Sequence, residues 1–172
     1  MAELIDFFDE NDQFVLTADR HTKRNENKSL FVRGVHIFLV NSDGEVFVQK
    51  RMPRQDAPHK WEIPSGHVQT EEHVDDAAKR ELKEETGITA HVYFLEKRKL
   101  DDPPEHDYFY AAYSDDPAEP ENQVPEETGY YSLKQLKAEL KKGKKEFVAP
   151  LLKLFADNPE WLEAITAKKA KE

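Results

Sequence analysis

The sequence contains no cysteine, which excludes a disulfide framework, a thiolate zinc site and a cysteine nucleophile. It has no run of eighteen apolar residues, and its N-terminus, Met-Ala-Glu-Leu-Ile-Asp, lacks the basic start and apolar stretch of a secretory signal. Basic residues are outnumbered, with 25 Lys and Arg against 35 Asp and Glu, which gives a formal net charge of −10. These absences predict a cytoplasmic protein without a membrane partner. They disfavour a nucleic-acid polymer and leave small anions as partners where a bound cation intervenes.

The composition fits one folded unit. A chain of 172 residues is near the usual size of one domain, and 38% of its residues are hydrophobic, which is enough to bury one core. We therefore predict a single domain, 1–172. It would comprise an N-terminal hairpin and connection (1–28), a core (29–158), and a C-terminal helix and tail (159–172).

Short apolar stretches alternate with turn residues along most of the chain. Residues 4–8 and 13–18 flank Asp-Glu-Asn-Asp, which predicts a hairpin, and 20–28 is expected to be a connection or a short exposed helix. The hydrophobic segments 31–40 and 46–50, separated by Asn-Ser-Asp-Gly, predict two antiparallel strands. Further strands are expected at 61–63, 66–68, 90–100 and 108–113, with a loop at 101–104 and a mobile surface loop at 114–127.

Helices are expected mainly after residue 72. The segment 73–86 contains no Gly or Pro and is followed by Gly87, a favoured helix stop. Ser132 and Gln135 have the form of a capping box, which predicts a helix to about residue 141. Two more helical segments are expected, at 146–156 and 160–167, before a frayed Lys-rich end.

Three glutamates share one face of the predicted helix 73–86. On a helix that turns roughly 100° per residue, Glu81, Glu84 and Glu85 fall within about a third of the circumference. Such a patch is usually a solvated face. Here, however, the lysines at 79 and 83 are mainly on the other side, and like charges this close favour a compensating cation. Oxygen-only ligands suit a hard cation such as Mg²⁺ or Mn²⁺.

The same segment carries a longer motif. Its members are Gly66, Glu72, Arg80, Glu81, Leu82, Glu84, Glu85, Gly87 and Ile88. They match the Nudix box, G-x5-E-x7-R-E-U-x-E-E-x-G-U with U a bulky aliphatic residue, at every defined position. Seven fixed identities arise by chance on the order of once in 10⁸ starting positions. The chain therefore resembles the Nudix family. The resemblance implies an α+β fold, a Nudix-type α/β/α sandwich with a mixed central sheet, here with an N-terminal β-hairpin.

The resemblance also implies an activity and a role for each box residue. The protein would be a metal-dependent hydrolase that cleaves a diphosphate linkage in a small nucleoside-diphosphate-type molecule by water attack at phosphorus, with Mg²⁺ or Mn²⁺ as cofactor. Glu81 and Glu85 would be the principal metal ligands, and Glu84 would complete the cluster or activate the water. Arg80 and Glu72 would orient these carboxylates. A glutamate of the later loop, 126 or 127, would help as a base only in some members of the family.

Substrate contacts are expected around the start of the box. Lys50 and Arg51 belong to a basic stretch, and Arg51 is the preferred phosphate contact because it ends a strand. A flexible basic loop that offsets nearby acids explains this stretch equally well. Gly66, which would permit the tight loop entering the box, and His67 complete the expected contacts. His36, in an apolar strand, is expected to be a packed core residue.

Two other functions remain open. Residues 3–88 also resemble Nudix proteins related to isopentenyl-diphosphate isomerase, but those isomerases place a catalytic cysteine just before Gly-His, where this chain has Ser65. Hydrolysis is therefore favoured. A non-catalytic nucleotide-binding module would be expected to lose box carboxylates, and this chain retains them. The sequence fixes neither the diphosphate that is cut nor the number of metal ions, and it is compatible with a homodimer.

Overall fold

The computed structural model describes residues 3–27, 29–143 and 145–170. These residues form nine strands and five helices. In chain order the elements are β1 (Leu4–Phe8), β2 (Phe14–Asp19), α1 (Arg20–Glu26), β3 (Val32–Val40), β4 (Val46–Lys50), β5 (Trp61–Glu62), β6 (Ser65–His67), α2 (Val74–Thr86), β7 (Tyr93–Asp101), β8 (Pro104–Tyr113), β9 (Glu127–Tyr131), α3 (Leu133–Lys142), α4 (Ala149–Asp157) and α5 (Glu160–Ala170).

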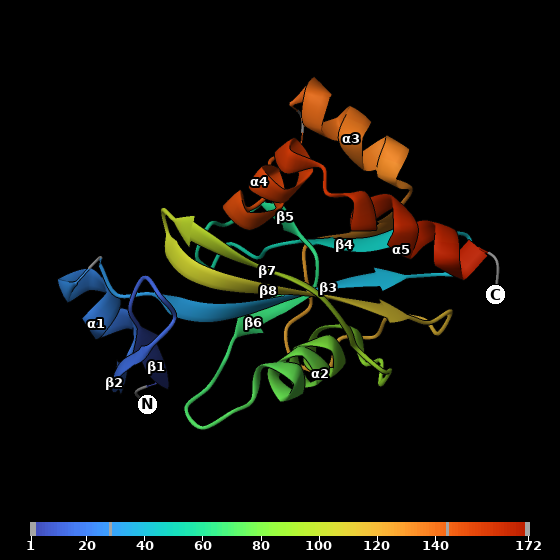
Figure 1. The fold of residues 1–172 in the computed structure, drawn as a ribbon. Coiled ribbons are helices and arrows are strands. Elements are labelled where there is room, and N and C mark those ends of the chain that lie inside the picture. Colours follow the sequence, from blue (N-terminus) through green and yellow to red (C-terminus); the bar gives the residue numbers. More distant parts are fainter. Residues whose placement is uncertain (1–2, 28, 144, 171–172) are drawn as a thin grey trace.

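A seven-stranded mixed sheet forms the centre of the fold (Figure 1). Its strand order is β5-β4-β3-β8-β7, with β6 paired to β3 and β9 paired to β4. Strand β3 runs parallel to β8, from Val32 opposite Glu105 to Val40 opposite Tyr113. Helix α2 covers one face of the sheet, and α3, α4 and α5 lie over the other (Figure 1). The predicted α+β class and α/β/α sandwich with a mixed sheet are therefore confirmed.

Strand β3 is buried on both faces, which explains its continuous hydrophobic sequence. Because successive side chains of a strand point to opposite faces, Phe38 packs in the cluster that contains Leu151 of α4. Its neighbour Ile37 packs in the other cluster, with Ala78 and Leu82 of α2. One strand thus joins the two halves of the core and holds α2 against the sheet.

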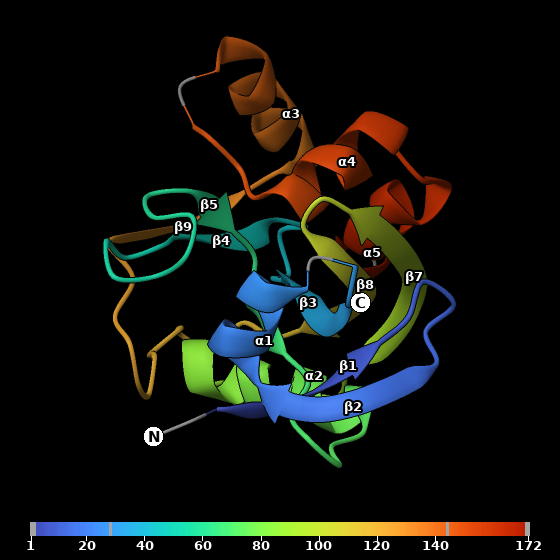
Figure 2. The same cartoon turned by 90° about the vertical axis from the view of Figure 1, so that its left-hand side faces the viewer.

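The predicted N-terminal hairpin is present as a second, two-stranded sheet. Asp9 closes its turn by accepting hydrogen bonds from the backbone N–H groups of Asn11 and Gln13, both at 2.9 Å. Phe7 is fully buried in a cluster with Val32, at the start of β3. Figure 2 shows the hairpin and α1 in front of one end of the main sheet. Of the two structures expected for 20–28, the helix is the one that forms, over Arg20–Glu26, while residue 28 lies outside the described residues.

Helix α2 ends where the sequence predicts. Its N-cap is His73, whose side chain accepts a hydrogen bond from the backbone N–H of Asp75. Its C-cap is Gly87, with φ of 73°, and the N–H of this residue bonds the carbonyl of Lys83. Glycine readily adopts this left-handed backbone conformation. The predicted capping box at the start of α3 is also present.

Strand β8 begins earlier than predicted. It starts at Pro104, inside the expected loop 101–104, because its parallel pairing with β3 reaches back to Glu105 and its hairpin with β7 closes between Asp101 and Pro104. Proline is tolerated as the first residue of a strand. Long-range pairing therefore overrides the local turn signal and extends the strand toward the cleft described below.

Other boundaries shift by a few residues. Strand β7 begins at Tyr93 rather than residue 90, α4 begins at Ala149 rather than residue 146, and α5 extends to Ala170 rather than residue 167. Strand β9 was not predicted from the sequence: it takes Glu127 from the expected loop and forms by long-range pairing with β4. Residues 171–172 of the expected frayed end lie outside the described residues.

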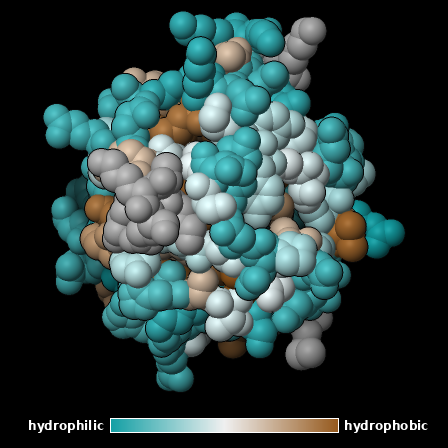
Figure 3. All heavy atoms as spheres, turned by 90° about the vertical axis from the view of Figure 1, so that its right-hand side faces the viewer, coloured by the Kyte–Doolittle hydropathy of each residue, from teal (hydrophilic) through white to brown (hydrophobic). Residues whose placement is uncertain are grey.

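The described helices are all too short or too polar to cross a membrane. On the face shown in Figure 3, hydrophobic residues appear as small spots separated by hydrophilic ones. The single-domain division of the chain, its cytoplasmic location and a homodimer stay predictions.

Candidate active site

The three box glutamates of α2 line one cleft. Its volume is about 750 Å³, and a neighbouring pocket of about 200 Å³ shares its glutamate wall. Both spaces are lined by Arg51, Gln55, Glu62, Glu81, Glu84, Glu85 and Gln123. The remaining walls of the larger cleft include β6, the loop between β4 and β5, the N-terminal segment and the start of β8. Helix α2 and the sheet thus bring carboxylates and basic side chains to the same space.

Glu81 lies against strand β6, where residue 66 is a glycine. A Cβ atom on Gly66 would stand 2.1 Å from the carboxyl carbon of Glu81, so any side chain here would displace this carboxylate. The sequence predicted a tight loop as the reason for Gly66. That reason was wrong, because Gly66 lies within β6 and is not among the described residues with positive φ. Burial raises the pKa of Glu81 to about 7, although the Arg80 guanidinium opposes this.

Glu85 lies deeper along the same face. One of its carboxylate oxygens accepts hydrogen bonds from the side-chain amide of Gln49 at 2.7 Å and from the backbone N–H of Ser65 at 3.0 Å. Burial raises the pKa of Glu85 well above its usual range, and the nearby carboxylates of Glu62 and Glu81 raise it further. A cation would relieve this accumulation of negative charge.

Glu62 is a site residue that the sequence analysis missed. The residue is 2% exposed, and its carboxylate accepts hydrogen bonds from Arg51 at 2.7 Å, Ser65 at 3.1 Å and Gln49 at 3.4 Å. The pairing of β4 with β5 sets Gln49 opposite Glu62. A single acidic residue within the apolar run Trp-Glu-Ile-Pro was the signal that could have pointed to it.

Arg80 connects four parts of the site. Its guanidinium donates two hydrogen bonds to Glu72, at 2.7 and 3.0 Å, and one to Glu81 at 2.6 Å. It also contacts the Glu84 carboxylate at 3.3 Å and the backbone carbonyl of His67 at 3.1 Å. Glu72 is held in turn by the backbone N–H of residue 69 at 2.9 Å. Arg80 therefore fixes the box carboxylates relative to β6.

Glu84 is more exposed than Glu81. Its side chain is 36% exposed, compared with 12% for Glu81. Like Glu81 and Glu85, it lines both the cleft and the neighbouring pocket, and its exposure gives it readier access than Glu81 to a molecule entering from solvent.

The two basic residues expected to contact substrate already have carboxylate partners. Lys50 lies 3.5 Å from Glu126 and 4.0 Å from Glu127, which fits the alternative that the basic stretch offsets nearby acids. Arg51 donates to Glu62 and to the backbone carbonyl of Asp56, yet it still lines the cleft. Among the described residues that line the cleft and the pocket, Glu126 and Glu127 do not appear. Their use as a base gains no support from this arrangement.

His67 and His36 both line the cleft. The Nε2 atom of His67 lies 3.7 Å from a carboxylate oxygen of Glu105. His36 is buried, as expected, and its ring stacks on Phe109 with centroids 5.0 Å apart. These contacts confirm the expectation of a packed core residue, and its Nε2 atom is also hydrogen-bonded to Asp107 at 2.7 Å.

The box donor set consists of carboxylate oxygens alone, which fits Mg²⁺ or Mn²⁺. The closest grouping of potential ligands lies elsewhere in the cleft. Among the described residues, one group of three has donor atoms all within 4.8 Å of one another, and its members are His36, Glu105 and Asp107.

Comparison with known proteins identifies the family of this chain. The family model of the NUDIX domain matches residues 30–151, more than half of the chain. The chain belongs to the Nudix family. An uncharacterized Nudix hydrolase of Pseudomonas aeruginosa is 36% identical over 115 residues, which are 66% of this chain and 67% of the relative. An RNA pyrophosphohydrolase of Novosphingobium aromaticivorans is 43% identical over 58 residues, so the match spans 34% of this chain and 35% of that relative.

Solved structures agree on the architecture. The protein DR0079 of Deinococcus radiodurans superposes with a TM-score of 0.70, covering 95% of this chain and 99% of its own, at 22% identity. The MutT protein of Methanosarcina mazei has a TM-score of 0.56 at 18% identity, covering 82% of this chain and 94% of its own. At these identities the likeness shows the fold alone.

Proposed function

We propose that this Nudix protein hydrolyses a diphosphate linkage in a small nucleoside-diphosphate-type molecule, by water attack at phosphorus, with Mg²⁺ or Mn²⁺ held by Glu81, Glu84 and Glu85. The observation that carries the proposal is the placement of these three carboxylates along one face of α2 in a cleft that also contains arginines. Family membership supports the same activity.

The local environment fits a divalent cation. Glu81 and Glu85 both have a raised pKa in the folded chain because burial and neighbouring carboxylates disfavour their charged forms. The bare glycine at position 66 keeps room for the Glu81 carboxylate beside β6. A divalent cation bound here would neutralise phosphate charge and acidify a nearby water.

The protein groups around the carboxylates hold them in position. Arg80 prevents Glu81 and Glu84 from turning freely, because its guanidinium is itself fixed by Glu72 and the His67 carbonyl. The amide of Gln49 and the N–H of Ser65 do the same for one oxygen of Glu85. Positioning of this kind is the main contribution a protein makes to phosphoryl chemistry.

The remaining cleft wall favours recognition of phosphate rather than of a base. Arg51, Arg54 and Lys60 contribute positive charge to the cleft that also holds the glutamates. The described residues that line the cleft and the pocket include no Phe, Tyr or Trp on which a base could stack. We therefore expect the rate to depend more on the number of phosphates than on the identity of the base.

The relatives named RNA pyrophosphohydrolase raise RNA as a further substrate, although they align over only about a third of this chain. The net charge of −10 opposes binding of a long polyanion. A substrate panel should therefore include a 5′-triphosphorylated RNA beside nucleoside di- and triphosphates, nucleotide sugars and an isoprenoid diphosphate.

The test is this panel, run with Mg²⁺ and with Mn²⁺ on the native protein, Glu81→Gln and Glu85→Gln. Glu160→Gln, the same chemical change on α5 away from the cleft, is the matched control. We expect hydrolysis of the diphosphate linkage in at least one substrate, loss of turnover by at least about 100-fold in both cleft variants, and native turnover in Glu160→Gln.

Turnover in the presence of a chelator, or native activity in both cleft variants, would overturn the proposal. A product with a shifted double bond and no released phosphate would identify an isomerase instead.

A further inference from the structure

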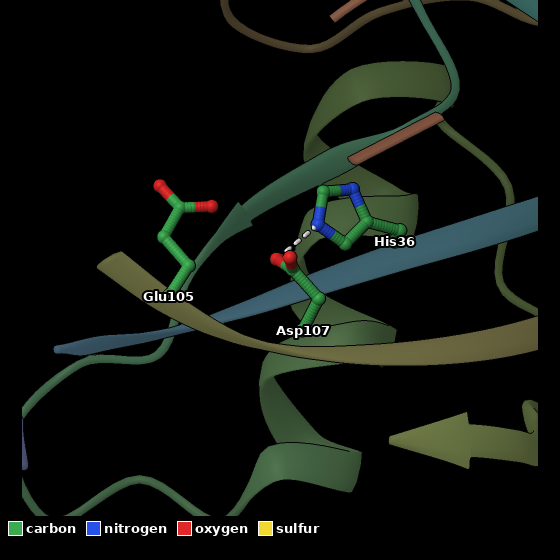
Figure 4. Close-up of side chains that lie close together, drawn as sticks. All are labelled: His36, Glu105 and Asp107. Atoms are coloured by element: carbon green, nitrogen blue, oxygen red, sulfur yellow. Dashed lines mark hydrogen bonds and ion pairs between the residues drawn. The ribbon is translucent and has the colours of Figure 1, made fainter. Parts of the chain in front are cut away.

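A second set of potential metal ligands lies beyond the box glutamates. His36 comes from β3, and Glu105 and Asp107 come from β8, the strand that runs parallel to it. Figure 4 shows the Nε2 edge of the His36 ring facing the Asp107 carboxylate, with Glu105 farther along the same strand. The imidazole and both carboxylates offer donor atoms that all lie within 4.8 Å of one another.

Gly34 keeps a space open between these donors. A Cβ atom on residue 34 would stand 3.0 Å from Asp107 Oδ1, 3.5 Å from His36 Nε2 and 3.9 Å from a carboxylate oxygen of Glu105. Gly34 is not among the described residues with positive φ, so its backbone conformation does not require glycine. The missing side chain instead leaves a position that all three donors surround.

This space opens into the cleft that holds the box glutamates. Gly34, His36 and Glu105 all line it. His67 lines it too, and its Nε2 atom, 3.7 Å from Glu105, offers a fourth donor at the edge of the cluster. An ion could therefore enter from solvent by the same route as the substrate.

We infer that His36, Glu105 and Asp107 bind a divalent transition-metal ion at a site separate from the box glutamates. One imidazole with two carboxylates suits Mn²⁺, Co²⁺ or Zn²⁺ better than Mg²⁺, which prefers oxygen ligands alone. The buried Asp107 carboxylate and the partly buried Glu105 carboxylate, beside one histidine, carry an excess of negative charge that such an ion would balance. This inference concerns binding and does not rest on the proposed hydrolysis.

The experiment measures Co²⁺ binding to the full chain carrying Glu81→Gln and Glu85→Gln, which weakens the box site. Visible absorption reports the ligand field of Co²⁺, and calorimetry counts the ions bound. We expect this double variant to bind one Co²⁺ per chain. Adding Asp107→Asn should weaken the binding by at least about tenfold, whereas adding Asp43→Asn, the same change in an exposed turn, should leave it unchanged.

Gly34→Ala, added to the same background, distinguishes binding at a defined coordination site from nonspecific attraction of the cation to negative charge. It keeps all three donors but fills the space between them, so we expect it to weaken Co²⁺ binding by at least about tenfold while the circular dichroism spectrum stays native. If the variant with Asp107→Asn fails to fold, Co²⁺ binding by the Gly34→Ala variant alone tests the inference. Absence of a Co²⁺ site in the double variant, or native affinity in Gly34→Ala, would overturn the inference whatever the hydrolase assay shows.

Discussion

The Glu81 carboxylate lies so close to Gly66 that residue 66 cannot carry a side chain without displacing it. The carboxyl carbon of Glu81 lies 2.1 Å from the point where a Cβ of residue 66 would stand. Helix α2 can place this carboxylate beside β6 only because the strand carries a glycine there. The contact explains why the box spans a strand residue and a helix residue fifteen positions later.

Gly66→Ala should therefore destabilise the protein through Glu81. Forcing an extra carbon into this contact should cost on the order of 1–3 kcal/mol of unfolding free energy. The cost should fall when Glu81→Ala removes the opposing carboxylate. Urea denaturation of the native protein, both single variants and the double variant measures this coupling. An equal cost of Gly66→Ala with and without Glu81 would contradict the explanation.

Arg80→Lys should impair catalysis more than stability. Lysine keeps the charge but cannot bond both oxygens of Glu72 and reach Glu81 at the same time. We expect kcat to fall by about 10²-fold with a small change in KM, because ligand positioning is lost. Arg98→Lys is the matched control, since Arg98 also binds two carboxylates, Glu96 and Asp157, away from the cleft. Equal effects of the two substitutions would argue against a positioning role.

Arg51→Ala should destabilise the chain far more than Lys50→Ala. Removing Arg51 leaves the Glu62 carboxylate buried without its charged partner, beside Glu85. We expect a loss on the order of 2–4 kcal/mol. The partners of Lys50 are more exposed, so the loss there should be at most about 1 kcal/mol. Chemical denaturation of the two variants in parallel tests this difference, and similar midpoints would refute it.

Asp12 should make stability depend on pH in the acid range. Burial alone would raise the pKa of Asp12, but hydrogen bonds from Arg33, Lys97 and Tyr108 hold it below its usual value. A lowered pKa stabilises the fold above the unfolded pKa of about 4, and this contribution is lost as the pH falls through the folded pKa.

Asp12→Asn should therefore be less stable than the native protein at pH 7, by on the order of 2–4 kcal/mol. The difference should shrink as the pH falls below about 4. Thermal unfolding between pH 2.5 and 7, with Asp43→Asn as the exposed control, measures it. A difference that stays constant across this range would show that the charge of Asp12 is not the cause.

Local signals in the sequence were enough to predict helix α2, the start of α3 and strand β3. The stop at Gly87, the capping box before α3 and the continuous apolar run of β3 each act within a few residues, and each is found as predicted. The box motif likewise specified which face of α2 carries Glu81, Glu84 and Glu85, because helical periodicity alone sets that face.

The surroundings of those glutamates depended on tertiary structure. Gln49 links Glu62 to Glu85 only because β4 pairs with β5. His36 meets Asp107, 71 residues away, only because β3 pairs in parallel with β8. The reason for glycine at positions 34 and 66 could not be predicted from neighbouring residues, because the side chains nearest to an added Cβ, those of Asp107 and Glu81, belong to other elements. Sequence by itself determined the family, the helix that carries the box glutamates and its acidic face, because those follow from neighbouring residues. Only the folded chain decided how charges from distant strands gather in one cleft, because strand register, which local patterns do not specify, sets which residues meet.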